Sequence, residues 1–260
     1  MLLIGCSVFG QEEMVNIPFK SSDQAKSLVI DLNEGEVSIV GTDRTDVLVR
    51  YQSHRSQSEG EQEGMEEKSK GLSKVSSGTK KIEMSSKENQ IMIRSDSYDA
   101  NLSFAIEVPK TIDLNIDIDF SGNVSIQDIQ GNVNVELASG DIRIQGLNGL
   151  LNASSDEGDI HVQFVNIPDP KTMMWMTTSG DIDVSLPSDY SAKLKVKADK
   201  GDVYSDLNIQ FQEKVERVQD TDEDGSFRYI NNSWTYGTLN AGGPEIIIIT
   251  KLGDIYLRKL

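Results

Sequence analysis

A short acidic run is the first stretch whose residues could do chemistry. It reads Asp220-Thr221-Asp222-Glu223-Asp224-Gly225. Carboxylates at alternate positions followed by glycine match the first half of a calcium-binding loop. The bidentate acid expected at the twelfth position is missing, since Asn231 stands there, and no helical pattern flanks the run. The run therefore predicts either a weak Ca²⁺ site held by Asp220, Asp222 and Asp224 or a plain acidic loop, and no other cofactor is implied.

A second set of carboxylates recurs directly after glycine. It comprises Asp141, Asp159, Asp181, Asp202 and Asp254, with Asn123 at the equivalent position. In stacked parallel strands such residues would lie about 4.8 Å apart, and a column of like charges needs compensation. Backbone N–H groups at each turn or a ladder of Ca²⁺ ions would provide it. Calcium-binding nonapeptides have paired glycines and a differently placed aspartate, so the backbone interpretation is favoured.

Signals for catalysis are weak throughout the chain. The two histidines, His54 and His161, stand apart, and the chain contains one cysteine and no Gly-x-Ser-x-Gly motif, which excludes a zinc site of the usual spacing. Polysaccharide lyases built on β-solenoids need clustered cations and a base. Here the outward basic residues are scattered and aromatic residues make up 6% of the chain; Trp175 and Trp234 are expected in the core or at its rim. We therefore expect no catalytic residue and no enzyme, with a polysaccharide-active enzyme as the alternative.

Glycine recurs at a fixed step in the middle of the chain, at 122, 131, 140, 149 and 158. In most copies a small polar residue follows, and then apolar and polar residues alternate. Alternation with period two is typical of a strand with one buried face, and a fixed step indicates a repeat architecture. Two nine-residue units would form one coil, so Gly122, Gly140 and Gly158 should stack on one edge and Gly131 and Gly149 on the other.

The pattern predicts an all-β fold, namely a single-stranded parallel β-helix (β-solenoid) with roughly 18–22 residues per coil. A right-handed coil is favoured, and an antiparallel meander or sandwich is the alternative. We expect one domain over 12–260, with polar insertions at 52–80 and 213–232. The apolar run Glu245–Thr250 predicts a strand that is buried on both faces or shielded by the acidic insertion, and Asp254–Leu257 is expected to end the stack.

Residues 1–11 are apolar and resemble a signal-peptide remnant, although a charged start is missing. Leu3-Ile4-Gly5-Cys6 resembles a lipobox, in which Cys6 would be lipidated. Ordinary cleavage near Gly10 and an unprocessed N-terminus are the alternatives. Lipidation and ordinary cleavage both predict export to the periplasm or the outer cell surface, and lipidation would add a lipid anchor.

The chain carries a formal net charge of −17. Binding to nucleic acid or to an anionic membrane surface needs Lys and Arg patches, which this balance disfavours. Beyond the N-terminus, no stretch approaches the roughly 18 apolar residues of a transmembrane helix. The expected partners are therefore an envelope protein or a glycan.

The turns Ser-Gly-Asp-Ile at 139–142 and 179–182 resemble those of the bacterial "putative adhesin" family of unknown function. The stretch 199–206 and the ending from Leu239 to Lys259 are also similar to that family, and the resemblance covers about 27–260. It implies an exported β-solenoid of the kind common in Bacteroidetes-type bacteria and supplies no catalytic residue. The name adhesin is a fold-level label. The resulting expectation is a non-catalytic envelope or cell-surface protein that serves as an adhesin, binding module or scaffold.

Overall fold

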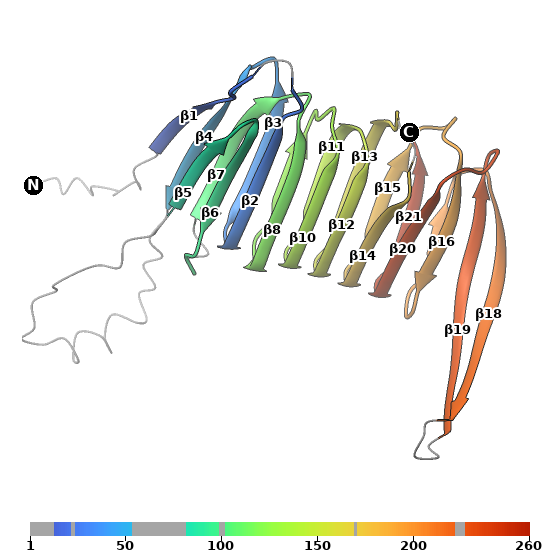
Figure 1. The fold of residues 1–260 in the computed structure, drawn as a ribbon. Coiled ribbons are helices and arrows are strands. Elements are labelled where there is room, and N and C mark those ends of the chain that lie inside the picture. Colours follow the sequence, from blue (N-terminus) through green and yellow to red (C-terminus); the bar gives the residue numbers. More distant parts are fainter. Residues whose placement is uncertain (1–12, 22–23, 54–81, 99–101, 169–170, 222–226) are drawn as a thin grey trace, which may run out of the picture.

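The computed structural model describes residues 13–21, 24–53, 82–98, 102–168, 171–221 and 227–260, with residues 53, 213–221 and 227–233 described as backbone alone. All regular elements over these ranges are β-strands, and they form two sheets (Figure 1). Sheet A has ten strands, in the spatial order β1 (Glu13–Pro18), β4 (Asp46–Ser53), β7 (Leu102–Pro109), β3 (Glu36–Thr42), β9 (Val124–Gln127), β11 (Ile142–Asn148), β13 (Ile160–Asn166), β15 (Ile182–Leu186), β21 (Ile255–Lys259) and β17 (Val203–Ser205).

Sheet B has eleven strands. Their spatial order is β18 (Ile209–Thr221), β19 (Phe227–Leu239), β16 (Ala192–Ala198), β20 (Glu245–Leu252), β14 (Met173–Ser179), β12 (Leu151–Glu157), β10 (Val133–Ser139), β8 (Asp113–Ser121), β2 (Ser27–Glu34), β6 (Gln90–Ser95) and β5 (Ile82–Lys87).

In the central part of the chain, successive strands alternate between the sheets, so that one strand of sheet B and the next strand of sheet A make a coil. Ile142 pairs in parallel with Val124 on one side and with Ile160 on the other. The same register continues from Ile160 to Ile182. The predicted parallel pairing between units two repeats apart is therefore confirmed.

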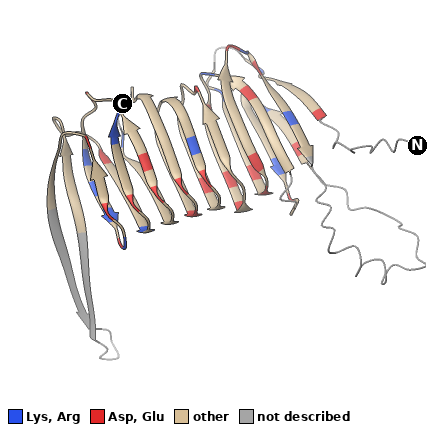
Figure 2. Cartoon of the chain, turned by 180° about the vertical axis from the view of Figure 1, so that it is seen from behind, with Lys and Arg blue, Asp and Glu red and all other residues tan. Residues whose placement is uncertain are grey.

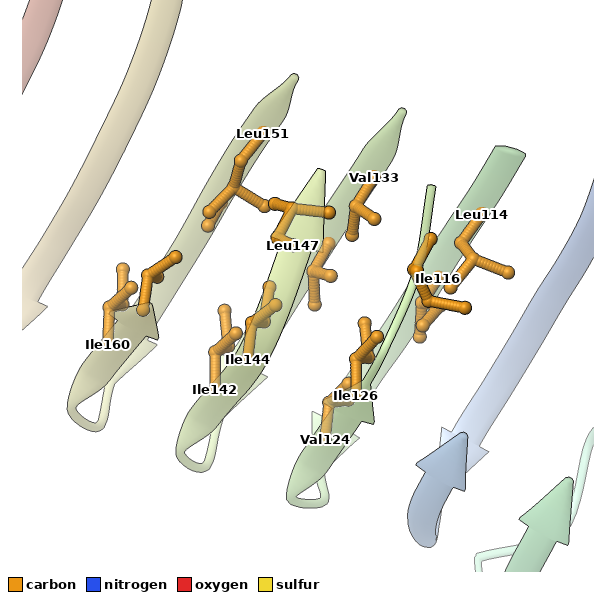
Figure 3. Close-up of a cluster of buried hydrophobic side chains, with 14 of the residues drawn as sticks. Leu114, Ile116, Val124, Ile126, Val133, Ile142, Ile144, Leu147, Leu151 and Ile160 are labelled. Atoms are coloured by element: carbon orange, nitrogen blue, oxygen red, sulfur yellow. The ribbon is translucent and has the colours of Figure 1, made fainter. Parts of the chain in front are cut away.

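The core lies between the two sheets and is built by the alternation seen in the sequence. In β10 and β11, for example, Val133, Val135, Ile142 and Ile144 are buried while the residues between them are not. Their side chains meet those of the next coils in continuous apolar rows (Figure 3). Each such side chain contributes about 1.5–3 kcal/mol by leaving water, which a single isolated coil could not gain.

The corners depend on glycine because the coils stack too closely there for a side chain. A Cβ on Gly140 would meet the carbonyl oxygen of Gly122, and one on Gly158 would meet that of Gly140. At the opposite corner, a Cβ on Gly149 would meet the carbonyl oxygen of Gly131. The predicted division of the glycines between two edges is confirmed.

The prediction of a single-stranded parallel β-helix is only partly right, because both sheets are mixed. At one end of the molecule β4 runs antiparallel to β1 and β7, and β5 runs antiparallel to β6. At the other end, β19 runs antiparallel to both β16 and β18. A terminal coil leaves backbone N–H and C=O groups unpaired, and a hairpin that turns back beside it satisfies them.

The order of the coils also differs from the prediction that Asp254–Leu257 ends the stack. The last coil of the chain, β20–β21, lies between β14–β15 and β16–β17. At the other end, β2 likewise lies between β6 and β8 in sheet B. The apolar sequence of β20 suits a strand with neighbours on both sides. It is not, however, buried on both faces, because Ile246 and Ile248 are buried while Ile247 and Ile249 are half-buried.

The acidic insertion at 213–232 was expected to be a loop, and most of it is strand. β18 and β19 pair antiparallel from Ile209↔Leu239 to Thr221↔Phe227 and form a long hairpin (Figure 1). Backbone pairing along the hairpin overrides the polar composition that predicted a loop. The insertion predicted at 52–80 falls almost entirely outside the described residues.

Candidate functional site

The corner aspartates form a ladder in which each side chain holds the backbone of the next coil. Asn123 Oδ1 accepts a hydrogen bond from the Asp141 backbone N–H (2.9 Å), and Asp141 Oδ1 accepts one from Asp159 (2.9 Å). The ladder continues through Asp181 and Asp254 to Asp202, each step at 2.8 Å. The predicted compensation by backbone N–H groups is confirmed. Among the described residues, no group of three His, Cys, Asp or Glu is placed to hold a metal ion.

The second carboxylate oxygen of most ladder aspartates faces a donor two residues further along the strand. Arg143 donates to Asp141 Oδ2 (2.8 Å), the Tyr256 hydroxyl to Asp254 Oδ2 (3.1 Å), and the His161 ring lies 3.7 Å from Asp159 Oδ2. For Asp141, burial acts to raise the carboxyl pKa. The backbone N–H of Asp159 and the Arg143 guanidinium outweigh it, so the pKa of Asp141 lies below its usual value.

We expect an Asp141→Ala variant to be less stable than the wild type at neutral pH, by about 1 kcal/mol, because the Asp159 N–H loses its acceptor. Since the folded pKa is lowered, this contribution is complete above the unfolded value of 3.8 and disappears as the pH falls through the folded pKa. Asp141→Asn, which retains an acceptor oxygen, should lose less. Urea unfolding of the three proteins at several pH values measures the difference, and a pH-independent gap between wild type and Asp141→Asn would contradict it.

The outer face of sheet A carries two adjoining grooves. The first has a volume of about 440 Å³, and its lining includes Ser38, Ala105, Ser125, Arg50 and Arg143. The second, of about 410 Å³, crosses β11, β13, β15 and β21. Its lining includes Arg143, Gln145, His161, Gln163 and Arg258. Arg143 lines both, so the two grooves adjoin at this side chain and follow one another across the sheet; together they are called the track.

Charges on this face are paired with one another. Arg50 Nη1 lies 2.8 Å from Glu107 Oε1, and Arg258 contacts both oxygens of Asp183 at 2.7 and 2.9 Å. Acidic and basic residues are accordingly interspersed along the strands (Figure 2). At the β17 edge the Tyr204 and Tyr256 rings stack, with centroids 5.2 Å apart. The hydrogen bond to Asp254 raises the Tyr256 pKa, and the Asp202 charge raises that of Tyr204.

The sequence of the chain matches a known protein family. Residues 74–229 match the model of the Toastrack DUF4097 family. The chain belongs to this family. The match confirms the resemblance to a bacterial family of unknown function that the repeated turns predicted.

Among solved structures, the Toastrack chain is similar to a protein from Clostridium sporogenes ATCC 15579 described as a "putative cell adhesion protein". The two share 12% identity with a TM-score of 0.50, over 97% of this chain and 100% of the other. A "putative adhesin" from Bacteroides fragilis NCTC 9343 matches with 14% identity and a TM-score of 0.31, over 96% and 97% of the two chains. The first likeness supports the fold alone. No curated protein matches this chain.

The calcium and lipidation residues predicted from the Toastrack sequence fall largely outside the described ranges. Asp220 lies in β18 opposite Arg228 of β19, with its backbone alone described. Asp222, Asp224, Cys6 and His54 lie outside the described residues, so the calcium site and the lipid anchor stay predictions. Over the described ranges there is no helix of the length and apolarity needed to cross a membrane.

The two tryptophans have different roles. Trp175 is fully buried and donates from Nε1 to the Leu151 carbonyl (3.2 Å), so it belongs to the core as expected. Trp234 lies on β19, with the Lys195 and Lys197 ammonium groups 4.3 and 5.6 Å from its ring centre. From the sequence, these lysines were expected to be scattered over the surface. Their spacing of two residues along one strand places Lys193, Lys195 and Lys197 on the same face, and this spacing could have predicted the row from the sequence.

Proposed function

We propose that the protein is a non-catalytic, exported binding module of the bacterial envelope, which holds a hydroxyl-rich glycan along the outer face of sheet A. The adjacency of the two grooves at Arg143 carries the proposal. Together they cross the strands from β4 to β21, about 35 Å at the spacing of neighbouring strands. A track of this length suits an extended chain better than a small molecule.

The side chains along the track have the chemistry of glycan recognition. Gln145 and Gln163 stand beside each other on β11 and β13, and each amide can both donate and accept hydrogen bonds. Sugar hydroxyls need that combination. The stacked pair of Tyr204, which is 49% exposed, and Tyr256 offers an aromatic surface near the end of the track.

The same face argues for binding rather than glycan cleavage. A lyase needs several cations converging on the substrate carboxylate, together with a base. The arginines of the track are instead each paired with a carboxylate: Arg50 with Glu107, Arg143 with Asp141 and Arg258 with Asp183. Their charges are already balanced by the protein, so they suit hydrogen bonding to a polar chain.

Two further observations support the proposal. The similar Clostridium sporogenes protein is described as a "putative cell adhesion protein", which agrees with a binding role. The apolar start at 1–11 supports export, either as a lipoprotein through Cys6 or after simple cleavage. Mass spectrometry of protein from native envelope fractions should find residues 1–5 removed, and an intact N-terminus on cytosolic protein would contradict export.

The test of binding is a screen of envelope glycans and envelope proteins against the purified chain, followed by calorimetric titration of each hit. We expect a glycan to bind, and Gln145→Ala/Gln163→Ala to weaken binding about tenfold by removing two hydrogen-bonding amides. Ser154→Ala, on the outer face of sheet B, is the matched control and should leave the affinity unchanged.

Three results would contradict the proposal. One is a screen in which only proteins bind. Another is a glycan whose affinity is unchanged by the glutamine substitutions. The third is the release of shortened sugars from a bound polysaccharide, which would establish catalysis.

A further inference from the structure

The outer face of sheet B is divided into three zones along the stack. The first, the acidic zone, lies on β8, β10 and β12 and consists of Asp113, Asp117, Asp119, Glu136 and Asp156. The second, the apolar ridge, lies on β14 and β20 and consists of Met174, Met176, Ile247 and Ile249. The third, the lysine row, lies on β16 and consists of Lys193, Lys195 and Lys197.

The apolar ridge is an unusual surface for so acidic a chain. Met174 and Met176 are 42% and 37% exposed, and they pair in register with Ile247 and Ile249 of the next strand. A hollow of about 540 Å³ runs alongside the methionines, and its floor includes Asn152 and Ser154. The apolar ridge and a hollow that its methionines help to line therefore adjoin on one face.

Over the part of the chain that the structure describes, no ion pair neutralises the acidic zone. Burial, and then the charges of Asp119, Glu136 and Asp31, raise the pKa of Asp117. Among the ion pairs of the described residues, none involves Asp117, Asp119 or Glu136, whereas Asp31 pairs with Arg94 at 2.7 Å. Like charges gathered in this way favour a partner that brings cations.

We propose that the outer face of sheet B binds a second copy of the same chain, face to face, about a two-fold axis that runs parallel to the strands between β12 and β14. Such an axis reverses the order of the strands but preserves the position along each strand. Asp113 and Asp117 of one copy, on β8, then lie over the lysine row of the other, and Met174 and Met176 lie over Asn152 and Ser154 in the partner's hollow.

The strand register makes this arrangement specific. The pairing runs in one row from Asp117 through Glu136, Ser154, Met176 and Ile249 to Lys197. Rotation about the axis places β16 opposite β8, so Lys197, which also pairs with Asp199 of its own copy at 3.0 Å, faces Asp117. Four residues earlier on each strand, Lys193 faces Asp113. Two residues earlier, Lys195 faces Asn115. By symmetry each contact occurs twice.

The size of the face agrees with a dimer of modest stability. The six strands from β8 to β16 cover roughly 650 Å² per copy at the usual strand spacing and rise. Two such faces come close to the lower end of standard protein interfaces, about 1,200 Å² in total. A copy of the chain fits better than an unrelated partner because its own face supplies the required reversed order of charges. The outer faces of sheet A stay free, so this inference does not depend on the proposed function.

The test uses two charge-reversal variants of the full chain, Lys193→Glu/Lys197→Glu and Asp113→Lys/Asp117→Lys. Each variant brings like charges together across the two-fold axis, so each should dimerise at least about tenfold more weakly than the wild type in sedimentation experiments. An equimolar mixture should form a heterodimer, because every altered residue then meets an opposite charge. Lys200→Glu/Lys259→Glu changes the net charge equally at a corner and on sheet A, and it should dimerise like the wild type.

Thermal melts first establish that each variant is folded. A wild-type chain that stays monomeric up to high micromolar concentration overturns the proposal. So does a folded lysine variant with unchanged dimerisation, or a mixture of the two variants that stays monomeric.

Discussion

An Ile142→Asp variant is expected to be largely unfolded at temperatures where the wild type is stable. Ile142 is fully buried in β11, between Val124 of one neighbouring coil and Ile160 of the other. A carboxylate at this point would have no water and no polar partner, and burial of an unpaired charge is among the most destabilising single changes. We expect a loss of more than about 4 kcal/mol in the free energy of unfolding.

Gln145→Asp is the matched control, because it introduces the same side chain on the same strand at an outward, exposed position. It should change the free energy of unfolding by less than about 0.5 kcal/mol. Urea denaturation followed by circular dichroism compares the two. An Ile142→Asp protein with a wild-type transition would mean that the face defined by Ile142, Ile144 and Leu147 is not the core.

The central coils could be predicted from the sequence because one physical requirement fixes several residues at once. Close stacking at the corner demands glycine, the exposed backbone of the next coil demands an acceptor such as Asp141, and the core demands alternation as in Ile142 and Ile144. All three requirements recur at each coil, so a period is visible even where one unit such as Gly149-Leu150-Leu151 departs from it.

The ends of the molecule could not be predicted in this way. Nothing in the sequence of β20–β21 distinguishes a last coil at the edge of the stack from one inserted between two earlier coils. The choice depends on pairing with β14 and β16, which are distant in sequence. The hairpin β18–β19 was missed for a related reason, since β18 is mostly polar beyond Phe211 and its strand structure depends on backbone pairing with β19.

The surfaces were the least predictable feature, because they combine side chains from strands far apart in the chain. The two grooves of sheet A meet at Arg143 but draw on strands from β4 to β21. The lysine row comes from one short stretch of the sequence. Its contact with Trp234, and its place at the opposite end of a row of paired residues from Asp117, exist only after folding. Composition had suggested only that cations are scattered.

The two proposals together describe a molecule with its binding faces directed outwards. If sheet B faces another copy, the outer faces of the two A sheets point in opposite directions. A dimer of that kind could hold two glycan chains at once, or two segments of one chain, and its apparent affinity would then exceed that of a single track. Dimerisation and glycan binding remain separable in experiment, since the substitutions expected to weaken binding lie on sheet A and those expected to weaken dimerisation lie on sheet B.

A Gly140→Ala variant is expected to be strongly destabilised, although only one methyl group is added. The φ angle of Gly140 is +134°, in a region that other residues rarely adopt, and holding alanine there costs about 1–3 kcal/mol. The added Cβ would also meet the carbonyl oxygen of Gly122 in the next coil. Moving the coils apart would lengthen the hydrogen bonds from Gly122 N–H to Ser139 (2.9 Å) and from Gly140 N–H to Glu157 (2.7 Å).

Gly242→Ala separates these two effects, because Gly242 also has a positive φ, of +72°, while the nearest atom to its added Cβ is Thr238 Cγ2 at 3.4 Å. The control should therefore lose only the conformational part. We expect Gly140→Ala to lose about 3–5 kcal/mol, which lowers the melting temperature by roughly 10 °C for a chain of this size. Differential scanning calorimetry of both variants measures the contrast. Equal losses in the two would mean that backbone strain alone selects glycine at the corner, and that the close approach of successive coils has no part in it.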